Sequence, residues 1–483
     1  MTVTLSPVDV AVIGMYFGAV LIIGFSASHR TRRGRQGGPG KSVEYLLAGR
    51  SLTTPVFVMT LVSTWYGGVL GVGEYTYRFG LSNWLVQGVP YYVFAFLFAF
   101  LLAKRVRATN FTTIPDKFHQ SYGKRTALLG AFLTFLLMTP APYLLMIGVL
   151  LQLVTGWSLW VCLVIGTLAT SVYLGLGGFR SSVSTDVFEF FLMFLGFGVI
   201  LPYAFVTFGG PTYIQNHVPP LHLTWSGGSS LQFMIVWFFI ALWTLVDPSF
   251  HQRCYAAKTG EVAQRGILWS IVFWVIFDGM TTTAGLYARA ALPHLEQPVM
   301  AFPLLAEVVL PPVAKGLFYA GMLAAIMASV NTQVFVSATT IGRDIVLRSR
   351  GWAAGSQELR YTRWGLPVTG VLSILLALLF PSVIQLWYII GTAIIPGLLI
   401  PLVTSYFPRF TVPSRFAFCS MLLGWVVSTV WFLAGWAHRM GSSSGYPLGV
   451  EPMYPGLVVS LLVWGVGYGV MKRKLSGQEV RGA

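Results

Sequence analysis

The sequence predicts an all-α integral membrane protein, and three observations support this fold class. Of the 483 residues, 55% are hydrophobic and only 10% are charged, whereas a soluble chain carries roughly 25% charged residues. The apolar residues form blocks of about 20, the length that a helix needs to cross roughly 30 Å of hydrocarbon. These blocks are continuously apolar rather than alternating, which excludes a β-barrel.

We expect thirteen transmembrane helices in one transmembrane domain that occupies residues 1–483, without a separate soluble domain. The predicted spans cover residues 8–26, 54–78, 81–103, 126–154, 159–176, 184–206, 231–249, 266–288, 316–340, 364–380, 383–406, 416–437 and 455–471.

The basic residues predict the orientation of these spans. The formal net charge is +16, and with the N-terminus outside only four of the 31 Lys and Arg residues fall outside: Arg78, Arg289, Lys315 and Arg439. Cytoplasmic loops of membrane proteins carry such an excess of positive charge. We therefore expect a multi-pass protein of a bacterial-type inner (plasma) membrane, with its C-terminus in the cytoplasm. This topology accounts for the charge without a nucleic-acid partner.

Two spans contain interruptions. The second span has four glycines within residues 67–73, and the seventh runs into Asp247 and Pro248. The second and seventh spans are five positions apart in the order of spans, as expected if a five-helix unit occurs twice. Because five is an odd number of crossings, the second copy must have the opposite orientation in the membrane to the first. Interrupted spans at matching positions in two halves indicate a transporter site. The alternative is that the glycines only permit close helix packing.

Five acidic residues lie in or at the ends of spans, where ionisable groups are expensive and usually functional. We expect no Lys or Arg deep in a span to pair with them, so each carboxylate needs a proton, hydrogen bonds or a bound cation. They are Glu74, Asp186, Glu189, Asp247 and Asp278.

Three of these acids also have alternative explanations. Asp186 could be stabilised in the first turn of a helix. Asp247 could face water at the inner end of its span, and Asp278 could be hydrogen-bonded to Thr281 and Thr282.

The stretch AAIMASVNTQ, residues 324–333, is polar for a membrane helix. Helical spacing places Ala325, Ser329 and Thr332 on one face. Two hydroxyls beside a small residue, completed by carbonyls of an unwound neighbour, could bind a cation. Alternatively, the hydroxyls could bond back to carbonyls of their own helix.

Five segments, in order, resemble the sodium:solute symporter family and cover nearly the whole chain. They are EYLLAGRSL (44–52), TIPDKFHQSYGKR (113–125), GGFRSSVSTDVFE (177–189), DPSFHQRCYAAKTGEVAQRG (247–266) and GMLAAIMASVNTQVFVSATTIGRDI (321–345). The resemblance implies a secondary transporter with a five-plus-five inverted-repeat core and discontinuous second and seventh spans. Its parts would be a peripheral first span (8–26), two repeats (54–206 and 231–406) and two C-terminal spans (416–471).

The resemblance also implies candidate Na⁺ ligands. One sodium would be held by the carbonyls of Leu61, Thr64 and Ala325 and by the hydroxyl of Ser329. The family's second hydroxyl position is Ala328, so one oxygen is missing.

A second sodium, which some members bind, would use Asp186 and Thr332. The signature's usual terminal glutamine is Glu189 in this chain. Glu189 and Glu74 are therefore candidates for gating or for carrying a proton.

The resemblance places the solute where the broken spans meet. The candidate residues are Ser63, Gly67, Gly68, Gln87, Trp243 and Asp278, with Trp243 at the position of an aromatic inner gate. Sugar-transporting members carry a glutamate and a lysine where this chain has Gln87 and Trp274, so a sugar is disfavoured.

We therefore expect a sodium-coupled symporter that carries a small polar organic solute by alternating access. The alternatives are a proton-coupled or uncoupled carrier on the same fold and a transporter-like sensor. Na⁺ is the expected coupling ion, with H⁺ as the alternative. The expected partners are the solute and membrane lipid, without nucleic acid or an obligatory protein partner. We do not expect an enzyme.

Overall fold

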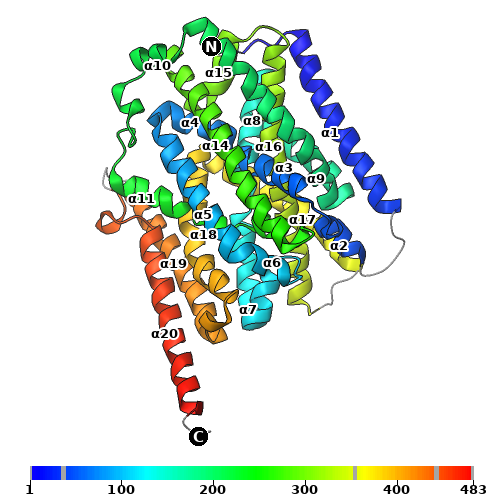
Figure 1. Cartoon of the computed structure of the whole chain (residues 1–483), viewed down its shortest axis with the longest axis vertical. Coiled ribbons are helices and arrows are strands. Elements are labelled where there is room, and N and C mark those ends of the chain that lie inside the picture. Colours follow the sequence, from blue (N-terminus) through cyan, green and yellow to red (C-terminus); the bar gives the residue numbers. More distant parts are fainter. Residues whose placement is uncertain (1–2, 34–39, 352–355, 440–444, 480–483) are drawn as a thin grey trace.

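The computed structural model describes residues 3–33, 40–351, 356–439 and 445–479. These residues form a bundle of helices elongated along one axis (Figure 1). Its α-helices are α1 (Pro7–Arg33), α2 (Gly40–Leu47), α3 (Thr54–Trp65), α4 (Val69–Phe79), α5 (Val89–Phe98), α6 (Lys104–Ala108), α7 (Ile114–Leu137), α8 (Ala141–Thr155), α9 (Leu159–Phe208), α10 (Pro211–His217), α11 (Leu231–Ile240), α12 (Trp243–Val246), α13 (Pro248–Ala256), α14 (Gly260–Ala291), α15 (Ala301–Val309), α16 (Ala314–Thr339), α17 (Ser356–Leu379), α18 (Val383–Ser405), α19 (Ser414–Arg439) and α20 (Met453–Glu479).

Within these described ranges, twelve helical segments are long and apolar enough to cross a membrane. The predicted fifth and sixth spans both lie in α9, which has a break at Gly178, where φ is +63°. Of the predicted fifth span, only Leu159–Leu168 forms an apolar helix, and this helix is too short to be included among the twelve segments. The count of thirteen therefore stays a prediction. The first described residues and the end of α20 lie at opposite ends of Figure 1, as an odd number of crossings requires.

The helices differ in how deeply they are buried. All residues in the most apolar stretch of α16 are buried inside the protein. In the corresponding stretches of α1 and α20, only 22% of the residues are buried. Figure 1 shows α16 inside the bundle, with α1 and α20 at its edges. The apolar side chains on the outer helices therefore suit a lipid environment, while α16 is enclosed by protein.

The second span is broken by its glycines. A 3₁₀ turn, Tyr66–Gly68, separates α3 from α4, and Gly68 has non-helical angles (φ −75°, ψ 17°). A Cβ on Gly67 would overlap the side chain of Ser329. The glycines therefore break the helix and also permit the close packing of α16, so both explanations hold.

The seventh span is broken by Asp247 and Pro248. Asp247 is extended (φ −67°, ψ 117°) between α12 and α13, and its carboxylate accepts hydrogen bonds from the first amides of α13. Proline fits the first helical turn, where its missing N–H is not needed. Hence α11, α12 and α13 form one interrupted span.

Candidate functional site

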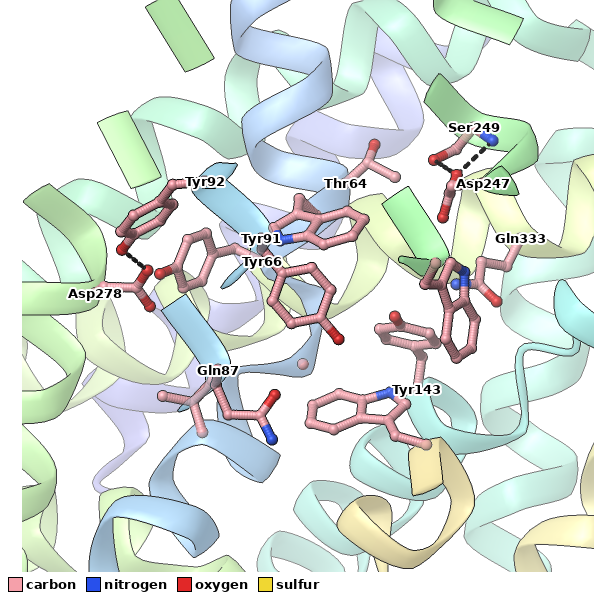
Figure 2. Close-up of a pocket in the computed structure, with 15 residues that line it drawn as sticks. Thr64, Tyr66, Gln87, Tyr91, Tyr92, Tyr143, Asp247, Ser249, Asp278 and Gln333 are labelled. Atoms are coloured by element: carbon pink, nitrogen blue, oxygen red, sulfur yellow. Dashed lines mark hydrogen bonds between the residues drawn. The ribbon is translucent and has the colours of Figure 1, made fainter. Parts of the chain in front are cut away.

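A cavity with about 850 Å³ of empty space, part of which is open to solvent, lies where the two interrupted spans meet (Figure 2). Its lining comes from both broken spans and from α5, α8, α14, α16 and α18: Thr64, Trp65, Tyr66, Gly68, Val72, Gln87, Tyr91, Tyr92, Tyr143, Trp243, Asp247, Ser249, Asp278, Gln333 and Trp387.

Aromatic rings and carboxylates dominate this lining. Seven of the residues are Trp or Tyr, two are Asp, and none is Lys, Arg or His. Aromatic faces attract cations, most strongly where water is excluded. The cavity is therefore chemically suited to a positively charged solute with apolar groups.

Asp278 reaches the cavity from α14. It is 6% exposed, and the hydroxyl of Tyr92 donates a hydrogen bond to its Oδ2 (Figure 2). Thr281 instead donates to its own helix, to the carbonyl of Phe277 at 2.9 Å. Thr282 accepts a bond from Asn83 at 3.1 Å. The structure therefore does not support a bond between the Asp278 carboxylate and these threonines.

Asp247 does not face bulk water as its alternative explanation supposed, because it is only 4% exposed. Its Oδ1 accepts bonds from the amides of Ser249 (2.6 Å) and Phe250 (3.2 Å) and from the Ser249 hydroxyl. The backbone break places this carboxylate at the N-terminus of α13, where the helix dipole favours it. It places a carboxyl group in the cavity wall.

The predicted solute residues fall into two groups. Gly68, Gln87, Trp243 and Asp278 line the cavity. Ser63 does not line it, and its hydroxyl donates back to the carbonyl of Met59 at 2.8 Å. Gly67 also lies outside the lining, against Ser329.

Among the predicted ligands of the first Na⁺, Ser329 and Thr64 lie together. The Ser329 hydroxyl, fully buried in α16, donates to the carbonyl of Thr64 at the end of α3. Leu61 and Ala325 are fully buried on the same two helices. Hard cations prefer oxygen ligands, and these residues would supply three carbonyls and one hydroxyl. Such a set of oxygens suits Na⁺ chemically, Ala328 adds no oxygen, and the sodium site stays a prediction.

The expectation that no Lys or Arg lies deep in a span is wrong. Arg253 in α13 is fully buried, and its Nη2 lies 3.2 Å from Oδ2 of Asp186, which is also fully buried. The same nitrogen donates to the hydroxyls of Thr332 (3.2 Å) and Thr64. A guanidinium therefore pairs with the residues predicted to hold the second Na⁺.

Glu189 lies one turn after Asp186 in α9. Its Oε1 accepts a bond from the hydroxyl of Tyr16 at 3.1 Å, and its Oε2 is buried without a hydrogen-bond partner. Glu74 lies in α4, where Arg78 pairs with it at 3.1 Å. These two candidates for gating or proton transfer lie outside the cavity lining.

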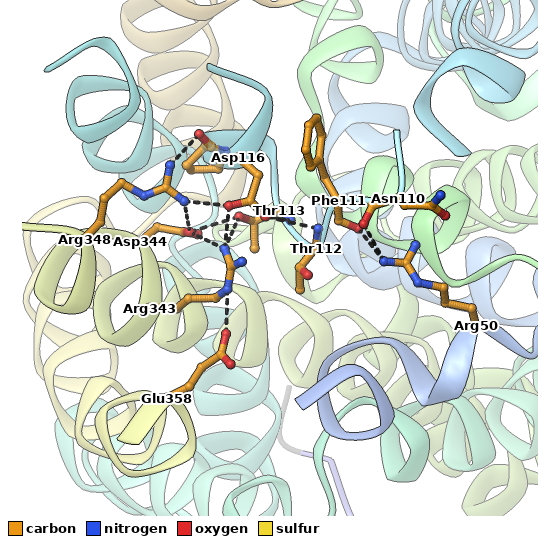
Figure 3. Close-up of polar contacts among 11 residues, drawn as sticks. Arg50, Asn110, Phe111, Thr112, Thr113, Asp116, Arg343, Asp344, Arg348 and Glu358 are labelled. Atoms are coloured by element: carbon orange, nitrogen blue, oxygen red, sulfur yellow. Dashed lines mark hydrogen bonds and ion pairs between the residues drawn. The ribbon is translucent and has the colours of Figure 1, made fainter. Parts of the chain in front are cut away.

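A network of ion pairs lies in the predicted inner loops (Figure 3). Arg343 pairs with Asp116 (2.9 Å), Asp344 (2.8 Å) and Glu358 (2.5 Å), and Arg348 pairs with Asp116 at 2.6 Å. These contacts connect the start of α7 to the π-helical stretch Thr340–Leu347, which continues α16, and to α17.

Beside this network, Arg50 fixes the chain before α3. Its guanidinium donates to the carbonyls of Asn110 (2.6 Å) and Phe111 (3.3 Å), as Figure 3 shows. Backbone hydrogen bonds also join Leu52 to Ala256, the last residue of α13, and to Lys258, just after it. The predicted inner ends of both interrupted spans are therefore held together.

Sequence reasoning missed much of the cavity wall. The missed aromatic residues are Trp65, Tyr66, Tyr91, Tyr92, Tyr143 and Trp387. Trp65 and Tyr66 directly precede the glycine break, which was a usable signal. Tyr143 and Trp387 come from α8 and α18, and nothing in their local sequence marks them.

Interrupted helices that meet at a cavity inside a membrane bundle define a secondary transporter. The chain belongs to the sodium:solute symporter family, whose model matches residues 45–424. The sodium/pantothenate symporter of Escherichia coli (strain K12) is 29% identical over 93% of this chain and 94% of that protein. The high affinity choline transporter 1 of Homo sapiens is 23% identical over 79% of this chain and 69% of that protein.

A solved structure of a Na⁺-coupled sialic acid symporter in a substrate-bound outward-open state shares the fold. It has a TM-score of 0.75 at 17% identity and covers 96% of this chain and 97% of that one. The five-plus-five core with two interrupted spans is thereby confirmed as the fold class.

Proposed function

We propose that this protein is a sodium-coupled symporter that carries a small polar organic solute by alternating access. The observation that carries the proposal is the contact between Ser329 and the Thr64 carbonyl, because Thr64 also lines the solute cavity. An ion bound there would order the wall on which the solute rests. Each ligand would then favour the same conformation, which is the basis of coupling.

The cavity favours a cationic solute, such as an amine or a quaternary ammonium compound. Asp247 and Asp278 supply negative charge, and the lining contains no basic residue. The family relatives named above carry pantothenate, an anion, and choline, a cation. Membership therefore does not name the solute, and the charge of this cavity supports the choline-like class.

A proton-coupled carrier is the second candidate, and Glu189 favours it. One oxygen of this fully buried carboxylate has no hydrogen-bond partner. A bound proton would remove the charge that is costly at this depth.

Thermal melts of the purified protein in NaCl and in KCl test the coupling ion. Ligand at one hundred times its Kd stabilises the folded state by about 2.7 kcal/mol. We expect NaCl to raise the Tm relative to KCl, and Ser329→Ala to remove the rise. Ser428→Ala is the matched control, because this buried serine also donates to a backbone carbonyl, that of Pro452 at 3.0 Å, but lies in α19.

If NaCl and KCl give the same Tm while acidification raises it, the proton-coupled candidate replaces the sodium-coupled one. Loss of that acid effect in Glu189→Gln would then identify the group that binds the proton.

We also propose that the protein resides in a bacterial-type inner membrane with its N-terminus outside. The support is the distribution of Lys and Arg under the positive-inside rule. A fluorescent protein that folds only in the cytoplasm, fused to the C-terminus, should fluoresce; a dark fusion that is nonetheless inserted would overturn the orientation.

A further inference from the structure

The guanidinium of Arg253 occupies a cluster of oxygens of the kind that binds metal cations. Its Nη2 meets Asp186 Oδ2 and Thr332 Oγ1, both at 3.2 Å, and the Thr64 hydroxyl. It also donates to the Thr60 carbonyl at 3.1 Å. A carboxylate, hydroxyls and a carbonyl form a hard-oxygen set, and here a positive charge of the protein itself fills it.

The other nitrogens of Arg253 fix its position. Nε donates to the Thr60 hydroxyl at 3.2 Å, and Nη1 donates to the Ser249 carbonyl at 3.4 Å. The partners come from α3, α9, α13 and α16, so this one side chain joins both interrupted spans to α9 and α16. The planar five-donor guanidinium suits such a multiple contact.

Charge balance makes Arg253 and a metal ion mutually exclusive at this position. Arg253 and Asp186 are both fully buried, and a buried carboxylate must be neutralised. Arg253 already neutralises Asp186. Adding Na⁺ among the same oxygens would bring two positive charges into contact in a poorly solvated place.

We propose that Arg253 is a tethered cation that takes the place of a second Na⁺, so that the protein binds a single Na⁺, at Ser329 and Thr64. This rests on the proposed function for the Ser329 site alone. The Asp186 position needs no ion from solution, and Arg253 supplies the bridging charge between the two interrupted spans.

The test counts bound Na⁺ with radiolabelled sodium on the purified full-length protein at saturation, without solute. We expect the wild type to bind a single Na⁺ and Arg253→Ala to gain a second. The double variant Arg253→Ala with Asp186→Asn should lose that second ion. Arg253→Lys, which keeps the positive charge, should bind a single Na⁺ like the wild type. A melt of each variant confirms that it is folded.

Two Na⁺ in the wild type would overturn the proposal, as would an unchanged count in folded Arg253→Ala. If Arg253→Ala does not fold, the number of Na⁺ ions bound by the single variant Asp186→Asn tests the proposal instead. Its Na⁺ count should not change, and loss of the ion would overturn the proposal.

The same experiment tests the proposed sodium coupling independently of the tethered cation. If the wild type binds no Na⁺, that function is wrong. The tethered cation would still stand if Arg253→Ala then gained an ion that depends on Asp186, and it would fall if no ion were gained.

Discussion

Asp278 places the negative charge of the cavity where it can contact a solute. Replacing it with Asn keeps the shape and removes the charge. We expect Asp278→Asn to weaken binding of a tetramethylammonium probe about tenfold, since loss of an attraction of about 1.4 kcal/mol has that effect. Quenching of tryptophan fluorescence measures it, because Trp65, Trp243 and Trp387 line the cavity.

Glu261→Gln is the control for this measurement. Its side chain is 61% exposed and lies away from the cavity, so probe binding should not change. Equal weakening in both variants, or binding of pantothenate in preference to the probe, would contradict a cationic solute.

His222, in the loop between α10 and α11, should make stability depend on pH. It is 7% exposed, and its Nε2 lies 3.0 Å from the Tyr77 carbonyl. Burial lowers the pKa of His222 below its usual value near 6.5. Neutral His222 therefore contributes fully to the stability of the folded state above about pH 6.5. This contribution is lost as the pH falls through the lower pKa that His222 has in the folded state.

We expect His222→Gln to flatten the fall in Tm between neutral and acidic pH. The exposed His119 offers a control, and His119→Gln should leave the profile of the wild type unchanged. A profile unaltered by His222→Gln would show that this histidine is not responsible.

At the scale of elements, the break between α3 and α4 depends on the absence of a side chain at Gly67. A Cβ there would overlap Ser329, so Gly67→Ala must push α16 away from the break. Overpacking costs about 1–3 kcal/mol. We expect a lower Tm and no stabilisation by NaCl. In Gly279→Ala, the added methyl has no neighbour within 4 Å, and stability should be unchanged or improved.

Some elements could be predicted from the sequence and others could not. Apolar blocks indicated the spans, and glycine and proline indicated the breaks. Hydropathy placed Arg253 in an inner loop, because a charged residue scores as exposed unless its partners are known. Those partners, Asp186 and Thr332, are 67 and 79 residues away. Likewise Tyr92 and Asp278 meet across 186 residues.

At the scale of the whole molecule, we expect the ion-pair network of Arg343 to stabilise closure of the predicted inner end. We expect Arg343→Gln to loosen it, because Asp116, Asp344 and Glu358 lose their shared partner. Native Cys254 in α13 is a suitable reporter, since it is buried beside this end. Its labelling by a thiol reagent should become faster in Arg343→Gln.

The exposed Cys419 should react at an unchanged rate and so serves as an internal reference. Arg409→Gln, a change at an exposed arginine, should not affect Cys254. If Cys254 reacts equally in all three proteins, the network does not hold the inner end closed.

The pairing of Arg253 with Asp186 would determine how much net charge the transporter moves across the membrane in each cycle, and so how strongly the membrane potential drives transport. A positive charge attached to the chain is not released into the cytoplasm, so in the proposed symporter only Na⁺ and solute would carry net charge inward in each cycle. Each charge that crosses is worth about 2.3 kcal/mol per 100 mV. A cationic solute would add its own charge to that of the single Na⁺. The membrane voltage could then sustain the accumulation that a second sodium would otherwise have to drive.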